Sequence, residues 1–118
     1  MKFIKKSAFL IPADAKKSLG ENGWEFYSNF RIPSFIMDHI IKVLNLSFVE
    51  KYLCIETYAN QEIKASIFYD ANGLIEIIYF QARKNSLRSI SNAFNTIGMP
   101  VNLELFIPSH GIYPSPNK

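Results

Sequence analysis

Apolar and polar residues alternate most regularly between residues 48 and 107. Three runs in this stretch, residues 52–58, 63–69 and 74–80, are rich in β-branched and aromatic side chains and alternate with a period of two. A period of two indicates a pleated strand whose side chains point to opposite faces of a sheet, and these residue types favour strands. The pattern therefore predicts three consecutive antiparallel strands.

The segment between the second and third runs predicts a hairpin with a defined register. Residues 70–73 combine Asp, Asn and Gly, which is typical of a three-residue loop in which Gly73 adopts the left-handed conformation. Such a loop places Tyr69 opposite Ile75. A second three-residue loop, at residues 59–61, would in the same way place Thr57 opposite Ile63.

These registers predict which side chains share a face of the sheet. One face is apolar, whereas the second face mixes charged and aromatic residues. The second face is expected to carry one row of Tyr52, Phe68 and Glu76, a next row of Cys54, Ser66 and Ile78, and a third row in which Glu56 and Lys64 pair beside Phe80. Fully burying a Phe side chain is worth about 1.5–3 kcal/mol. We therefore expect the N-terminal segment or a partner protein to cover part of this face.

Two further stretches follow helical spacing. Residues 35–45 come directly after Pro33, which favours a helix start, and they carry an apolar stripe that includes Ile36, Ile40, Val43 and Leu44. Residues 87–97 carry a second stripe, and Asn85 or Ser86 can cap this helix. Alternation over residues 101–107 predicts a further strand.

The N-terminal residues complete the predicted order. Residues 1–12 suggest a short strand that ends at Pro12, residues 13–23 a loop, and residues 24–30 a strand. The predicted fold class is α+β, an antiparallel sheet of four or more strands with two helices packed on one face, in the order β-α-β-β-β-α-β, to which the strand at residues 1–12 adds an optional early strand. We expect a single domain over residues 1–118 with a loosely ordered tail at residues 109–118.

Composition narrows the class of protein. The 118 residues are 48% hydrophobic and 19% charged, which is typical of a globular chain. Residues 1–31 carry six basic and three acidic side chains, whereas the remainder carries seven of each, so the net charge of +3 lies in the first quarter. This excess is typical of a solvated surface, or alternatively of attachment to an acidic partner or nucleic acid.

The single cysteine and the first residues of the chain indicate the cellular compartment of the protein. One cysteine excludes an internal disulfide and suggests a reducing compartment. The start resembles a signal peptide, but its apolar stretch at residues 8–11 is shorter than the roughly 7–15 residues such a region needs. No apolar run approaches the roughly 18 residues of a membrane span. We therefore expect a cytoplasmic protein without a membrane partner.

Few residues are candidates for catalysis or metal binding. His39 lies on the first predicted helix and His110 in the tail, while Cys54 is predicted opposite Ser66 without a nearby base. Two histidines and one cysteine, widely spaced, form no metal-ligand pattern. The glycines are isolated, so no phosphate-binding loop is present. We expect no cofactor, no metal and no enzymatic activity.

Nucleic-acid functions stay open as alternatives. The element order resembles that of RNA-recognition modules, which stack bases on aromatic residues of a sheet, and Tyr52, Phe68 and Phe80 are the candidate platform. Glutamates on the sheet disfavour a phosphate backbone there. A small basic ribonuclease or toxin domain using His110, Lys64 and Arg83 is a further alternative.

In size, layout and lack of catalytic residues, the whole chain resembles the small cytosolic immunity proteins of bacterial toxin–immunity systems, including those of contact-dependent growth inhibition. It differs from many immunity proteins against nucleases, because those proteins are often acidic whereas this chain is basic. The resemblance implies that the chain neutralises a cognate toxin by covering its active site. The candidate contacts are Tyr52, Glu56, Lys64, Phe68 and Glu76 on the second face and Tyr113 in the tail, because aromatic and charged side chains dominate interfaces. A homodimer that buries the aromatic face is another possibility.

Overall fold

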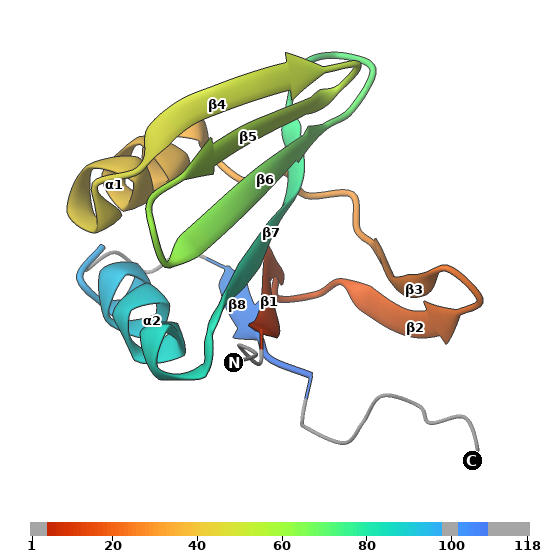
Figure 1. The fold of residues 1–118 in the computed structure, drawn as a ribbon. Helices are drawn as coiled ribbons and strands as arrows, with labels where there is room; N and C mark the ends of the chain where they lie inside the picture. Colours follow the sequence, from red (N-terminus) through yellow and green to blue (C-terminus); the bar gives the residue numbers. More distant parts are fainter. Residues whose placement is uncertain (1–4, 98–101, 109–118) are drawn as a thin grey trace.

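The computed structural model describes residues 5–97 and 102–108, and within them two helices and a two-stranded hairpin surround a six-stranded antiparallel sheet (Figure 1). The strand order in the sheet is β4-β5-β6-β7-β1-β8, so β4 and β8 form its edges. The elements are β1 (Lys5–Pro12), β2 (Lys16–Gly20), β3 (Gly23–Tyr27), α1 (Ser34–Leu44), β4 (Ser47–Tyr52), β5 (Ile55–Ala59), β6 (Ile63–Tyr69), β7 (Ile75–Arg83), a short 3-10 turn (Lys84–Ser86), α2 (Leu87–Asn95) and β8 (Leu103–Phe106).

The predicted fold class is confirmed: an α+β protein with both helices on one face of an antiparallel sheet. The hydrophobic core lies between the helices and this face, which we call the helix face. The stripes of α1 and α2 bury Ile36, Ile40 and Ile90 there, because their spacing of three or four residues keeps them on one side of a helix. The sheet contributes Ala8, Leu10, Ile63, Ala65, Ile67, Ile78, Phe80 and Ala82.

The helix boundaries agree closely with the sequence pattern. Pro33 lies at the N-cap of α1, and Asn45 closes the helix in the left-handed conformation that favours asparagine. Ser86 lies at the N-cap of α2, but its hydroxyl donates to Glu62 Oε1 at 2.7 Å and not to the helix. Val43 was expected in the buried stripe of α1 and is instead exposed.

Two strands were missed by the sequence pattern. The segment predicted as a loop at residues 13–23 contains β2, which pairs with β3. The run at residues 52–58 is not one strand, because a turn at Leu53 and Cys54 divides it between β4 and β5. Neither turn residue is a common turn former, and Leu53 adopts a positive φ of 56° that glycine adopts far more readily.

The registers of the two later hairpins are only partly as predicted. Gly73 has a φ of 80° and Tyr69 lies opposite Ile75, as the loop chemistry predicts. Beyond this pair β7 carries an extra residue, Glu76, so that Phe68 faces Ile77. The preceding hairpin pairs Thr57 with Ser66 and not with Ile63, and the predicted register is therefore wrong there.

These differences exchange side chains between the two faces. Ile78 and Phe80, expected on the second face, are fully buried on the helix face. Glu56 pairs with Ile67 and so also lies on the helix face, away from Lys64. Cys54 lies exposed in the turn before β5 and not opposite Ser66. The tail at residues 109–118, with His110 and Tyr113, lies outside the described residues, as does Val101 of the predicted last strand.

Candidate functional site

The sheet face opposite the helices, which we call the outer face, is the candidate binding surface. Cross-strand neighbours point to the same side of a sheet, so the observed pairs define its rows. One row crosses four strands and consists of Tyr52, Ile55, Phe68 and Ile77. All four side chains are apolar or aromatic, so this row forms a continuous apolar strip, which we call the apolar row.

The β2–β3 hairpin covers one end of the outer face. Phe26 lies 4.9 Å from Phe9 of β1, measured between ring centroids, and Trp24 lies 4.9 Å from Phe106 of β8. Lys17 of β2 also binds Glu104 at 3.1 Å. An N-terminal hairpin therefore packs on part of the outer face, and Figure 1 shows it on the side of the sheet opposite the helices. It is one of the two covers that the sequence left open, but Ile78 and Phe80, whose burial motivated that expectation, lie on the helix face.

The other end of the outer face, at edge strand β4, is open to solvent. Tyr52 is 68% exposed and Leu53 in the adjoining turn is 76% exposed. Phe48 of the same strand is also exposed, but its pairing with Tyr58 places it on the helix-face side of the sheet. An edge strand presents unpaired backbone N–H and C=O groups that can pair with another chain. Exposed apolar side chains and an unpaired edge therefore occur together on β4.

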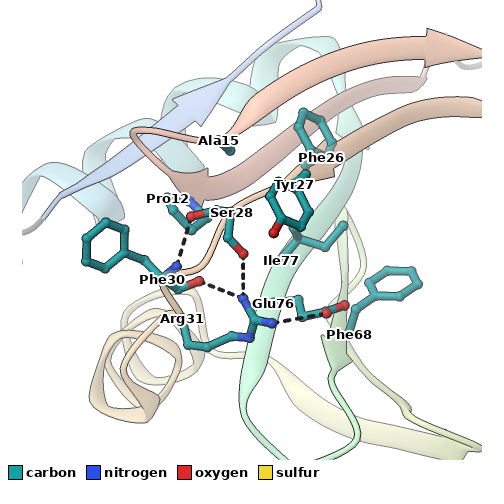
Figure 2. A pocket seen from close by; sticks show the side chains of 10 residues that line it. All are labelled: Pro12, Ala15, Phe26, Tyr27, Ser28, Phe30, Arg31, Phe68, Glu76 and Ile77. Carbon is teal, nitrogen blue, oxygen red and sulfur yellow. Dashed lines mark hydrogen bonds and ion pairs between the residues drawn. The ribbon is translucent and has the colours of Figure 1, made fainter.

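A pocket lies where the hairpin leaves the sheet (Figure 2). Phe68, Glu76 and Ile77 form its floor on the sheet, and Phe26 and Tyr27 of β3 form a wall. The remaining lining residues are Pro12, Ala15, Ser28, Phe30 and Arg31. Because Phe68 and Ile77 also belong to the apolar row, the row runs from the exposed edge at β4 into this pocket.

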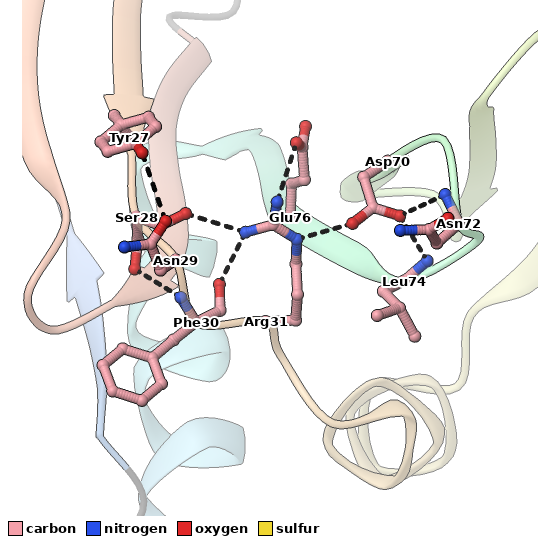
Figure 3. A network of polar contacts seen from close by, with 9 residues as sticks. All are labelled: Tyr27, Ser28, Asn29, Phe30, Arg31, Asp70, Asn72, Leu74 and Glu76. Carbon is pink, nitrogen blue, oxygen red and sulfur yellow. Dashed lines mark hydrogen bonds and ion pairs between the residues drawn. The ribbon is translucent and has the colours of Figure 1, made fainter.

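Arg31 fixes the segment between β3 and α1 against the β6–β7 hairpin (Figure 3). Its Nε donates to Asp70 Oδ2 at 2.8 Å, and its Nη1 donates to the carbonyl oxygens of Ser28 and Phe30 at 2.9 Å each. Its Nη2 lies 3.6 Å from Glu76 Oε2. The hydrogen bond to Asp70 raises the pKa of Arg31, so the guanidinium stays charged.

Asp70 is held from two sides. Besides the contact with Arg31, its Oδ1 accepts the backbone N–H groups of Asn72 and Leu74 at 2.8 and 3.0 Å and so closes the hairpin loop. The hydrogen bond from Arg31, followed by those from the backbone, lowers the pKa of Asp70 below its ordinary value of 3.8. The carboxylate is therefore ionised throughout the neutral range.

The structure brings most of the sequence-predicted contact residues to the outer face. Tyr52 and Phe68 belong to the apolar row, and Glu76 adjoins it at the mouth of the pocket. Lys64 lies on the same face two residues along β6 from Ser66, opposite Gln81 of β7. Tyr113 lies outside the described residues.

Glu56 is separated from this group. It accepts a hydrogen bond from the Tyr69 hydroxyl at 2.8 Å on the helix face. Burial and this hydrogen bond raise the pKa of Tyr69 above its ordinary value, so the hydroxyl keeps its proton. The geometry gives Glu56 a structural contact between β5 and β6.

The residues named for the nucleic-acid alternatives are placed as follows. Lys64, Gln81 and Arg83 line one hollow of about 390 Å³ at the end of β6 and β7. Phe80 cannot serve in a base-stacking platform because its side chain is fully buried on the helix face. His110 lies outside the described residues.

Within residues 5–97 and 102–108, no three His, Cys, Asp or Glu side chains are grouped to hold a metal ion. His39 of α1 contacts Thr96 through Nε2 and Oγ1 at 3.0 Å, which joins the two helices. Neither of the described helices has the length and apolar character needed to cross a bilayer.

Arg31 and Asp70 are the functional-site residues that sequence reasoning missed. The Asp, Asn and Gly at residues 70–73 predict the role of Asp70 in the loop. The sequence does not predict its pairing with Arg31, because 39 positions separate the two residues and only the folded chain brings them together. Arg31 also lies 3.6 Å from Glu76, and both residues line the pocket.

Comparison with known proteins identifies no relative of this chain. No protein-family model matches the chain, and searches of curated proteins and of solved structures likewise find no match. The fold defines the chain as an α+β protein with helices on one face of a six-stranded antiparallel sheet and a hairpin on the other.

Proposed function

We propose that this chain is a cytoplasmic immunity protein that binds a cognate bacterial toxin and neutralises it by covering the toxin's active site. The observation that carries the proposal is the apolar row, which runs from the exposed edge strand β4 across four strands to the pocket at Glu76. Surface patches in which apolar side chains gather beside an unpaired edge favour protein binding.

The composition of this surface supports binding to a protein. Aromatic side chains that become buried in an interface contribute much of the binding energy, and Tyr52 and Phe68 supply two of them here. Glu76 at the border of the row fits the polar rim that surrounds such a core, and Lys64 lies two cross-strand rows further along the same face. Edge strand β4 can in addition pair with a strand of the partner.

Affinity purification from native extract treated with nuclease tests the proposal. We expect one stoichiometric protein partner whose own toxic activity is suppressed when the two are mixed. The Tyr52→Ala variant should lose most of this partner, because truncation of an aromatic hot-spot residue costs 2 kcal/mol or more, about thirtyfold in affinity.

Phe35→Ala is the matched control. Phe35 is an exposed aromatic residue on α1, on the opposite side of the sheet from the apolar row. This variant should retain the partner at wild-type stoichiometry. If Tyr52→Ala and Phe35→Ala retain the partner equally, the apolar row is not the interface; if no protein partner is recovered at all, the immunity function is rejected.

RNA binding is the second candidate, favoured by the basic side chains of Lys64 and Arg83, which line one hollow at the end of β6 and β7 that is far from the apolar row. A site of this kind would bind RNA with an affinity that falls steeply as salt is raised. Filter binding of single-stranded RNA at low and high salt tests it. Lys64→Glu should abolish such binding, and an absence of binding at low salt would eliminate this candidate.

A further inference from the structure

The pocket between the β2–β3 hairpin and the sheet has the dimensions of a site for one side chain. Its volume is about 140 Å³. Pockets for cofactors and drug-sized ligands occupy about 300–1,000 Å³, whereas a cavity of about 150 Å³ holds a single benzene ring. The pocket therefore fits the end of one side chain from another protein and is too small for a nucleotide.

Aromatic rings make up much of the pocket's lining. Phe26 and Tyr27 approach from the hairpin and Phe68 from the sheet (Figure 2). Tyr27 is 65% exposed, so an entering group can reach its ring. The face of an aromatic ring attracts a cation, and a planar guanidinium also stacks on it.

Arg31 and Glu76 are the charged residues that line the pocket, and Asp70, paired with Arg31 outside the lining, adds a second negative charge. The charge of Arg31 is balanced by Asp70, whose Oδ2 lies 2.8 Å from Nε, and two carbonyl oxygens accept hydrogen bonds from the Nη1 of Arg31 (Figure 3). Glu76 lies 3.6 Å from Nη2, beyond the 2.7–2.9 Å typical of a charge-assisted hydrogen bond. The side chain of Glu76 is 47% exposed, and its carboxylate can accept further donors. One positive and two negative groups therefore favour an additional cation beside Glu76.

We propose that this pocket receives the guanidinium of an arginine side chain of the partner protein. The guanidinium stacks on the aromatic lining and donates to Glu76, whose contact with Arg31, at 3.6 Å, is longer than the 2.8 Å contact between Arg31 and Asp70. Arginine fits better than lysine because its planar group can stack and donate in parallel to a carboxylate. This inference rests on the proposed protein-binding function and assigns the chemistry of one contact within it.

Titration with N-acetyl-arginine amide, followed by amide chemical shifts of the labelled protein, tests the pocket directly. We expect saturable shifts at Ser28, Phe68 and Ile77, with a dissociation constant on the order of millimolar because so small a ligand makes few contacts. N-acetyl-citrulline amide, which has nearly the same shape without the charge, should bind at least about tenfold more weakly.

Variants at two carboxylates sharpen the test. Glu76→Gln should weaken arginine binding about tenfold, while Glu50→Gln, which removes an exposed carboxylate elsewhere on the outer face, should leave it unchanged. Amide chemical shifts that are unchanged for residues away from the pocket establish that each variant is folded. Equal binding of arginine and citrulline, or no saturable shift at the pocket residues, would overturn the inference.

Binding of the partner protein to the wild-type chain and to Glu76→Gln distinguishes failure of the arginine site from failure of the proposed protein-binding function. If the partner binds the wild-type protein and Glu76→Gln equally, the arginine site is rejected and the protein-binding function stands. If no partner protein exists, the proposed protein-binding function is rejected. The titration with N-acetyl-arginine amide still shows whether the pocket binds a guanidinium selectively.

Discussion

Asp70 serves two purposes with one carboxylate: it closes the β6–β7 loop through backbone N–H groups and it anchors Arg31. The folded-state pKa of Asp70 lies below its unfolded value of 3.8. As pH falls, the unfolded chain therefore binds the proton first, and the stabilisation is lost progressively below about pH 4. Above that pH the contribution of Asp70 is fully present.

Asp70→Asn should accordingly lower the unfolding temperature at pH 7, because the amide keeps an acceptor for the loop but loses the charge that binds Arg31. The difference from the wild-type protein should narrow as pH falls below about 4, since the wild-type carboxylate is then protonated. Thermal unfolding followed by circular dichroism from pH 7 to pH 2.5 measures both. Glu21→Gln, an exposed change in the β2–β3 turn, is the control, and a constant difference for Asp70→Asn at every pH would contradict this account.

Leu53 has a backbone conformation that its side chain disfavours. Its positive φ of 56° costs an L-residue roughly 1–2 kcal/mol, and the side chain, 76% exposed, regains little by burial. Strain kept at an exposed apolar position suggests a role in binding. The residue lies in the turn beside Tyr52, next to the proposed interface.

Leu53→Asn should therefore stabilise the protein by about 0.5–1 kcal/mol, because asparagine tolerates this conformation, and should weaken partner binding. Urea unfolding and partner affinity measure the two effects. Leu74→Asn is the matched control, since Leu74 is also exposed but has no positive φ. The strain argument fails if the two variants change stability equally.

At the scale of elements, the sequence predicts periodic segments well and irregular ones poorly. Both helices were located because their apolar stripes repeat over three turns, and the β6–β7 loop because Gly73 has the φ that its turn requires. The extra residue Glu76 was not predictable. Ile32 bridges to Ile75 through a 2.9 Å hydrogen bond, and Arg31 contacts Glu76, so distant segments hold the bulge.

The hairpin β2–β3 is held on the sheet by its aromatic rings. Phe26 lies within 4.9 Å of Phe9 and 5.8 Å of Phe106, measured between ring centroids. Phe26→Ala should cost about 2 kcal/mol, less than the 3–5 kcal/mol for a fully buried Phe because the side chain is only half-buried. Phe35→Ala should change stability by less than about 0.5 kcal/mol. Comparable losses in urea unfolding would contradict the packing role of the hairpin.

At the scale of the whole molecule, the two faces of the sheet have different surroundings. The helices cover one face completely enough to bury Ile78 and Phe80, while the hairpin covers only the β1–β8 end of the other. The sequence predicted a mixed second face that something covers, but the helices bury Ile78 and Phe80 of that predicted face, and the hairpin covers Phe9 and Phe106 instead. It did not predict the composition of the row, because a turn at Leu53 and a bulge at Glu76 each change the pairing.

The measurement that most directly tests the outer face as the binding surface uses the exposed Cys54, beside edge strand β4. A photo-crosslinker attached there should capture the cognate toxin, whereas the same reagent at Lys42→Cys on α1, in a Cys54→Ser background, should not. Capture from α1 and not from Cys54 would contradict the account, as would cross-links from Cys54 only to a second copy of this chain.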